Sequence, residues 1–336
     1  MKTVVKISCF WFFFLSGFSI AGQDVSFSQF YSNPLYLNPA FAGSVGTPRF
    51  GLQYRNQWSG FNNAFTTYSA AFDMAVEKLQ GGVGVYVMND ALANNALNSL
   101  QINLIYTTFV RLNETFQLNG AVQAGYHQNS LNAQQLIFPD NVDPYFGNHG
   151  VSQELQYLNQ PNFSYVDFST GVLVFSEKYF LGLTAHHLAE PRQSFYEGAE
   201  EVGKLYRKYS AHFGARLPIY LYGHHRKYFD ISPQVVVQRQ GSFSQINYGT
   251  FATKYGFSVG AWFRQNFGLR YDAVIFMVGF FRKSWQLVYS YDITVSGLRP
   301  DSGGTSEISL SFLLKEGGKK RSLPFYNRYE EEFGVE

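Results

Sequence analysis

The feature that most constrains this chain is an alternation of apolar and polar residues that continues along most of its length. In residues 284–294, for example, Leu287 and Tyr289 occupy one parity, and Gln286 and Ser290 occupy the other. The same period-two pattern recurs at 49–58, 115–127 and 307–314. Side chains of a β-strand point alternately to two faces, so each stretch is predicted to be a strand with one apolar and one polar face.

The polar faces carry little charge. Charged residues make up 15% of the chain, against about 25% in an average soluble domain, while aromatic residues reach 18%. Gln, Ser, Asn and Thr dominate the polar parities, whereas the solvent face of a soluble two-sheet sandwich usually carries Lys and Glu. Trp58, Trp262 and Trp285 lie near predicted strand ends, where a membrane-interface girdle places aromatic residues. This balance favours a barrel with a lipid-facing exterior over the sandwich, which alternation alone also allows.

Strand lengths and connections point to the same architecture. The alternation predicts about fourteen strands of about ten residues each, typical of outer-membrane proteins. They cover residues 48–58, 64–74, 80–89, 98–110, 114–127, 163–175, 178–189, 204–217, 227–239, 243–253, 255–265, 269–281, 284–295 and 305–315. Short connections mostly alternate with long ones such as 128–162, and outer-membrane barrels have tight periplasmic turns and long external loops. The connection 218–227, which should be short, and Pro233 inside a predicted strand both fit poorly.

The predicted fold class is therefore all-β, a transmembrane antiparallel up-and-down β-barrel of the outer-membrane type. The longest clean apolar run after the first 22 residues is 273–281, about half of the roughly 18 residues that a spanning helix needs. A membrane location then requires a closed barrel, because only helices and closed barrels satisfy every backbone polar group in lipid. An even number of strands returns both ends of the barrel to the periplasmic side.

The N-terminus has the composition of a secretory signal peptide, predicted to cover residues 1–22. Lys2 and Lys6 form the charged region, residues 7–18 form the apolar region, and cleavage is expected after Ala21 or Gly22. A retained membrane anchor would need a longer apolar run. The only cysteine lies inside this segment, so the mature chain is expected to have no disulfide, thiolate metal site or thiol nucleophile.

The sequence offers little that could carry chemistry. In the pairs His186–His187 and His224–His225, strand neighbours point to opposite faces, so neither pair can easily chelate one ion. We interpret both pairs as polar residues at loop ends or in the girdle. No nucleophile elbow or phosphate loop occurs, and a net charge of +2 argues against nucleic-acid binding. We predict no catalytic residue, no cofactor and no metal site.

Several charged residues fall on the polar parity and are expected to face the lumen, as a cross-barrel salt network or a selectivity lining. They are Arg55, Lys208, Arg216, Asp292 and Glu307. His127 and His212 share that parity.

Two stretches are more specific than a general barrel pattern. Residues 23–44 read QDVSFSQFYSNPLYLNPAFAGS, and YRNQW follows at 54–58. Together with GAWFR at 260–264 and YSYDITVSGL at 289–298, they make the chain resemble the PorP/SprF family of outer-membrane proteins from Bacteroidota, which is tied to type IX secretion and gliding motility. The motif positions are Asn33, Pro34, Asn38, Pro39, Ala40, Gly43, Tyr54, Arg55, Asn56, Gln57 and Trp58.

We divide the chain into four parts: a signal peptide (1–22), an N-terminal periplasmic or plug-like segment (23–47), the barrel (48–315) and a C-terminal periplasmic tail (316–336). The two Asn-Pro steps favour turns and bar helix continuation, so the second part is expected to be extended and pinned. Its Leu35, Leu37 and Phe41 are expected to pack inward.

The resemblance implies a non-enzymatic component of the type IX secretion and gliding machinery that supports export or anchoring of surface adhesins. Its implied partners are outer-membrane lipid, periplasmic ring or peptidoglycan-binding proteins of the machinery, and a surface adhesin. The polar lumen parity leaves open a second interpretation, a porin or solute channel of the outer membrane.

Overall fold

The computed structural model describes residues 24–61, 65–132, 162–195, 203–220, 227–282, 284–296 and 302–314, together with 136, 142–143, 147–148 and 152. The predicted signal peptide and the predicted C-terminal tail lie outside this description, and so do His224 and His225. No helix in the described ranges has the length and apolar character needed to cross a membrane.

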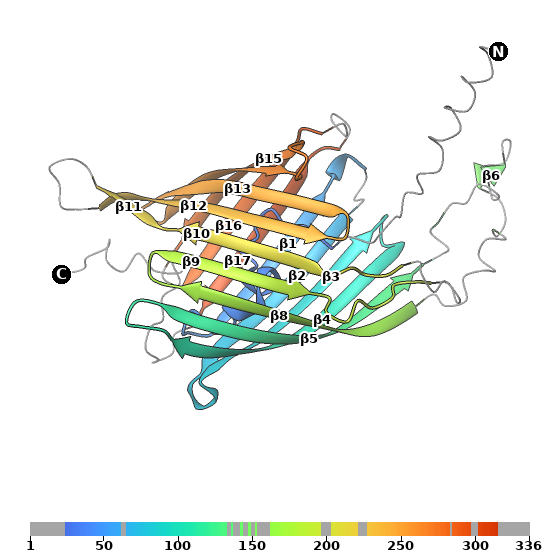
Figure 1. The fold of residues 1–336 in the computed structure, drawn as a ribbon. Helices are drawn as coiled ribbons and strands as arrows, with labels where there is room; N and C mark the ends of the chain where they lie inside the picture. The colour runs from blue at the N-terminus through green and yellow to red at the C-terminus, as the bar shows by residue number, and fades with distance from the viewer. Residues whose placement is uncertain are drawn as a thin grey trace, which may run out of the picture.

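One antiparallel β-sheet closes on itself to form a barrel (Figure 1). Its strands are β1 (Arg49–Gln57), β2 (Phe65–Val76), β3 (Gly81–Leu92), β4 (Leu97–Arg111), β5 (Gln117–Leu131), β8 (Asn162–Phe175), β9 (Tyr179–His186), β10 (Lys208–Ala215), β11 (Leu217–Tyr220), β12 (Lys227–Gln240), β13 (Phe243–Lys254), β14 (Phe257–Gln265), β15 (Tyr271–Phe281), β16 (Trp285–Thr294) and β17 (Thr305–Leu313). A short hairpin of β6 (Val142–Asp143) and β7 (Gly147–Asn148) lies between β5 and β8. The first strand β1 pairs with the last strand β17, and β10 pairs with β12 to complete the closure.

The barrel has fourteen strands, because β10 and β11 form one interrupted strand of the fifteen-stranded sheet. Gly214 pairs with Gln234, and Leu217 pairs with Ile231, so both segments keep one register against β12. The interruption lies opposite Pro233, which has no backbone N–H to donate across the ladder. The predicted barrel of about fourteen strands is confirmed. We predicted that the next connection begins at residue 218. This was wrong, because the strand continues to Tyr220.

The connections define two different ends of the barrel. The loop end carries the connections 58–64, 93–96, 132–161, 187–207, 241–242, 266–270 and 295–304, including the short 3-10 helix η2 (Ser59–Phe61). The turn end carries 77–80, 112–116, 176–178, 221–226, 255–256 and 282–284, including η3 (Glu77–Leu79). The barrel also begins and ends at the turn end, where Leu314 N–H donates to Pro48 O at 2.9 Å. By the rule of external long loops, the loop end is expected to face the cell exterior.

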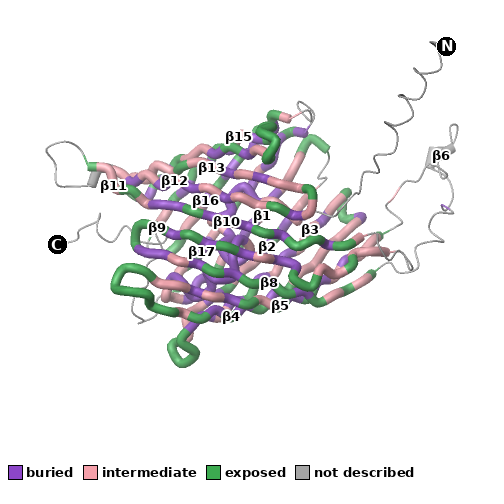
Figure 2. Tube along the Cα trace, viewed as in Figure 1, coloured by how far each residue is buried: buried purple, intermediate pink, exposed green. Residues whose placement is uncertain are grey.

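Burial alternates along the strands, as the period-two pattern requires (Figure 2). In β16, Ser290 and Asp292 are buried inside the barrel, whereas Tyr289 and Ile293 are exposed on its outer face. The exposed outer residues are mainly Val, Leu, Ile, Phe and Tyr, which suits contact with lipid. The predicted facing of the strands therefore agrees with the structure at these positions.

Trp262 departs from the predicted girdle. It has the parity of Arg264 and points into the barrel, where its side chain is fully buried and packs against Phe251 at 4.2 Å between ring centroids. Gly249 and Gly260 make room for the indole, since a Cβ on either residue would lie 2.3 Å from it. Trp262 is thus part of the interior packing, and assigning it to the interface was wrong.

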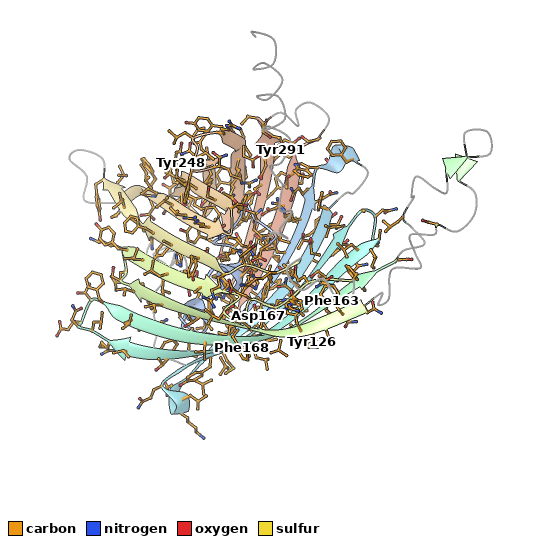
Figure 3. The ribbon with its side chains drawn as sticks, turned by 45° about the vertical axis from the view of Figure 1, so that its right-hand side comes forward. Tyr126, Phe163, Asp167, Phe168, Tyr248 and Tyr291 are labelled. Atoms are coloured by element: carbon orange, nitrogen blue, oxygen red, sulfur yellow. The ribbon has the colours of Figure 1, made fainter. Side chains whose placement is uncertain are left out.

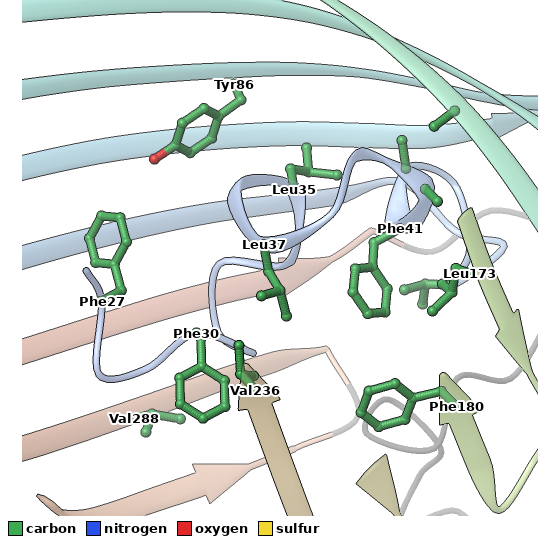
Figure 4. Packing of buried hydrophobic residues seen from close by; sticks show 14 of the residues in the cluster. Phe27, Phe30, Leu35, Leu37, Phe41, Tyr86, Leu173, Phe180, Val236 and Val288 are labelled. Atoms are coloured by element: carbon green, nitrogen blue, oxygen red, sulfur yellow. The ribbon is translucent and has the colours of Figure 1, made fainter. Parts of the chain in front are cut away.

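The N-terminal residues 24–47, which we call the plug, lie inside the barrel. We expected an extended segment, but each Asn-Pro step begins a short helical turn: α2 (Pro34–Leu37) and the 3-10 helix η1 (Pro39–Phe41). Leu35, Leu37 and Phe41 are buried in a cluster with lumen residues such as Leu173 and Phe180 (Figure 4). The barrel therefore has an apolar core of its own, built jointly by the plug and the strands.

Candidate functional site: the lumen and its plug

Local sequence explains how the plug folds. Pro34 starts α2 and Pro39 starts η1, positions that suit proline because the first N–H groups of a helix lack intrahelical partners. Between them, the side-chain oxygen of Asn38 accepts from Ala40 N–H at 2.9 Å and caps η1. The amide nitrogen of Asn38 donates to Val172 O at 3.1 Å and approaches Nε2 of His212 at 3.0 Å. One motif residue therefore both shapes the plug and attaches it to the wall.

Polar side chains of the wall satisfy the backbone of the plug. Thr107 donates to Pro39 O at 3.1 Å, and Asn119 donates to Ala40 O at 3.0 Å. Thr184 on β9, two strands along the sheet from β5, donates to Leu37 O at 3.3 Å. Buried carbonyl groups need such partners, so the polar parity of these strands serves the plug rather than bulk water.

Glu307 on β17 forms the first charged attachment. Its two carboxylate oxygens accept the backbone N–H groups of Ser28 at 2.7 Å and Gln29 at 2.9 Å. Arg55 on β1, directly opposite Glu307 in the register, forms a buried ion pair with the same carboxylate. The side chain of Gln29 also donates to Glu307 O at 2.9 Å. This strand pair therefore binds the plug through a neutralised carboxylate.

A second buried ion pair lies beside the first. Arg264 on β14 contacts Asp292 on β16 at 2.7 Å and also donates to the Ser28 hydroxyl at 2.6 Å. The Ser28 hydroxyl in turn donates to Asp292. Two arginines and two carboxylates thus surround one plug residue, and their formal charges balance.

The start of the plug is held by a third cluster, the clamp, formed by Asp24, Asp167, His187 and Lys208. Asp24 accepts from Nε2 of His187 at 2.8 Å and from Nζ of Lys208 at 3.1 Å. Nδ1 of His187 lies 2.7 Å from Asp167, which points inward from β8 whereas its neighbour Phe168 is exposed (Figure 3). The backbone N–H of Asp24 donates to the side chain of Gln240 at 3.1 Å.

The contacts within the clamp keep His187 and Asp24 charged. Burial alone would lower the pKa of His187, but the charge of Asp24 and the hydrogen bond to Asp167 raise it to about 9. Burial opposes the charge of Asp24 most strongly, yet His187 and Lys208 hold the pKa of its carboxyl well below the usual value. Near neutral pH, His187 is therefore an imidazolium between two carboxylates.

At the turn end the plug meets β2 and β3 through a glycine. Gly43 N–H donates to Asp73 at 2.8 Å, and Asp73 also binds Arg49 at 2.7 Å. Gly43 has φ +69°, and a Cβ there would lie 2.8 Å from the Cα of Gly82. The motif glycine is required for both its backbone conformation and its close approach to the wall.

Four of the predicted lumen charges, Arg55, Lys208, Asp292 and Glu307, lie inside the barrel and contact the plug. The fifth, Arg216, lies near the turn end and contacts Asp230 at 3.0 Å. His127 and His212 are also buried inside.

The remaining motif residues of β1 lie elsewhere. Tyr54 faces outward and its ring lies 5.1 Å from that of Tyr68. Asn56 shares this outward parity, while Gln57 accepts from Arg55 at 2.9 Å. Trp58 has φ +56° at the loop end.

Sequence reasoning missed Asp24, Arg264 and His187. Arg264 had the lumen parity and could have been found from it. We interpreted the pair His186–His187 as polar residues at a loop end or in the girdle. His187 does lie at the loop end, but not in the outward girdle: its backbone turns to φ +58° after β9, so His186 and His187 are both buried inside. Among the described residues no group of three or more His, Cys, Asp or Glu side chains is arranged to hold a metal ion.

A cavity of about 740 Å³ opens at the loop end, above the plug. Asp24 and Ser26 of the plug form part of its lining, together with Trp58, Arg270 and Tyr271 of the barrel. We call this space the vestibule. It has the size of a small-molecule or short-peptide site.

A closed barrel with an apolar exterior and a plugged lumen defines an outer-membrane β-barrel protein. The chain belongs to the PorP/SprF family: the family described as type IX secretion system membrane protein PorP/SprF matches residues 19–312. The protein is accordingly an outer-membrane protein of the type IX secretion system. No curated protein matches the chain in sequence.

Solved structures similar to this chain include an outer membrane protein, a channel and a transporter. The P. putida toluene transporter TodX is 8% identical to this chain, and the match has a TM-score of 0.45. It covers 83% of this chain and 93% of the transporter. The CymD monoaromatic hydrocarbon channel shares 9%, covers 85% and 93%, and has a TM-score of 0.44. The Acinetobacter baumannii outer membrane protein Omp33 shares 9%, covers 80% and 100%, and has a TM-score of 0.42.

Proposed function

We propose that this protein is a non-enzymatic component of the type IX secretion machinery that supports export or anchoring of surface adhesins. Membership of the family supports a role in secretion. The observation that carries the non-channel role is the plug, which joins both ends of the lumen through buried ion pairs and hydrogen bonds. A barrel filled in this way suits a fixed scaffold in the outer membrane, to which other components of the machinery attach.

The plug also weighs against the alternative of a porin or solute channel. Lumen polar groups that would line a water-filled pore instead bind plug atoms, as Thr107, Asn119 and Thr184 do. Buried aromatic residues of the plug, Phe27, Phe30 and Phe41, pack in one cluster with residues of the inner wall. A channel would require these contacts to break.

Deletion of the gene, followed by measurement of adhesin on intact cells, tests the proposal. We expect loss of surface adhesin, restored by the wild-type gene, with normal outer-membrane permeability to small solutes. Purified protein should give no steady ion conductance in a planar bilayer. Normal adhesin display in the deletion strain, together with a porin-like conductance, would favour the channel instead.

The implied partners are periplasmic ring or peptidoglycan-binding proteins of the machinery. Co-purification from native membranes with a tagged copy tests this part separately. The matched control is an unrelated outer-membrane barrel with the same tag, which should not recover those proteins.

A further inference from the structure

The plug passes through the barrel from the loop end to the turn end. Asp24 lies at the loop end, since it contacts His187 just after β9, Lys208 at the start of β10 and Gln240 at the end of β12. Gly43 lies at the turn end, between the end of β2 and the start of β3. The plug therefore runs the length of the lumen before β1 begins.

We propose that the mature N-terminus of this protein lies on the outside of the cell, at the external mouth of its own barrel. Asp24 closely follows the predicted cleavage sites, and it lies at the loop end. The chain then passes inward through the lumen as the plug and returns outward as β1. The number of barrel strands alone would place both ends of the chain in the periplasm, and the plug reverses this for one of them.

The external end of the plug is fastened from five neighbouring segments of the wall. Asp24 is bound by the segment after β9, by β10 and by β12, and β8 supports the clamp through Asp167. Ser26 donates to the side chain of Gln245 near the start of β13 at 3.0 Å. These contacts come from neighbouring strands of one part of the wall, and they fix the first plug residues in the mouth.

The vestibule exposes the start of the plug at the loop end. Asp24 and Ser26 lie on its lining, and Arg270 and Tyr271, on the same lining, are exposed at the barrel rim. A protein that binds the external face of this barrel would therefore meet the N-terminus itself.

Cysteine labelling on intact cells tests the proposal. The only native cysteine lies in the predicted signal peptide, so single cysteines report cleanly, with the wild type as background control. One cysteine is inserted directly before Asp24; Arg270→Cys marks the loop end and Glu177→Cys marks the turn end. With a membrane-impermeant maleimide, we expect the inserted cysteine and Arg270→Cys to react on intact cells, and Glu177→Cys only after permeabilisation.

Reaction of the inserted cysteine only after permeabilisation, like Glu177→Cys, would overturn the proposal. So would an inverted barrel in which Glu177→Cys alone reacts on intact cells. A second measurement does not depend on labelling access. A thiol crosslinker of short reach should join Ser26→Cys to Gln245→Cys, which lies near the loop end of β13. It should not join Ser26→Cys to Asp230→Cys, which lies near the turn end of β12. The reverse result would place the plug in the opposite direction.

Discussion

At the residue scale, a few buried ions determine where the plug sits. Glu307 and Asp292 each bind an arginine of the wall and a group of the plug. Without the plug, both carboxylates would lose hydrogen-bond donors. Buried ion pairs add little net stability, but removal of one partner leaves an uncompensated charge and costs about 3–5 kcal/mol. Their placement therefore specifies one position of the plug more than it strengthens the barrel.

The clamp predicts a particular pH dependence. The pKa of His187 is raised to about 9, above its ordinary value of 6.5, so its stabilising contribution is complete below about pH 6.5 and is lost as the pH rises through 9. Asp24, whose pKa is lowered, contributes above its ordinary value of 3.8, and this is lost in more acidic solution. We compare the unfolding free energies of wild type and His187→Gln in urea. The advantage of wild type should be constant at pH 5–6.5 and smaller above pH 9. An advantage that grows between pH 7 and 10 would contradict the clamp.

Gly43 predicts a steric effect at the opposite end. In Gly43→Ala, the left-handed φ and the contact with Gly82 both oppose the new methyl group, so we expect a loss of more than about 1 kcal/mol in unfolding free energy. Gly51→Ala is the matched control, because its Cβ would meet nothing closer than 3.7 Å. Urea unfolding in detergent measures both. Equal stability of the two variants would show that the plug can shift away from β3.

At the element scale, alternation predicted the strands well because lipid outside and a packed lumen inside impose period two on every strand. The same rule did not predict which inward residues are apolar: Trp262 fills space left by two glycines, a property of the neighbouring strands rather than of its own. The partners of Asp24 were out of reach for a different reason. The plug has no regular period, and the contacts of Asp24 join residues more than a hundred positions apart.

The outer face gives a depth-dependent prediction. Phe276 lies near the middle of β15 and is exposed on the outer surface, so Phe276→Arg should cost about 2–4 kcal/mol in the bilayer. Phe280→Arg, near the end of the same strand and on the same outer face, should cost about 0–1 kcal/mol. Heat-modifiable gel mobility and unfolding in lipid vesicles measure the difference. Equal tolerance at both depths would mean that this strand does not face lipid.

At the scale of the whole molecule, the two ends of the chain have different roles. The plug is integrated into the barrel, whereas the barrel alternation is complete by Leu314 and residues 317–318, both glycine, do not favour its continuation. The tail beyond has a basic stretch at 319–321, an acidic stretch at 330–332, and aromatic residues between them. Aromatic residues flanked by charge are common where proteins bind one another.

We therefore predict that the tail is a periplasmic docking element and not part of the fold. Truncation after Lys315 should leave a heat-modifiable barrel in the outer membrane, because its last strand ends at Leu313 and pairs fully with β1 and β16. The truncated protein should recover less of the periplasmic machinery in co-purification, since the charged and aromatic groups that bind it are gone. A full-length copy with the three residues at 330–332 changed to Gln separates the acidic contribution from the aromatic one. Unchanged partner recovery on truncation would exclude docking by the tail, and a barrel that no longer assembles would assign the tail to the fold.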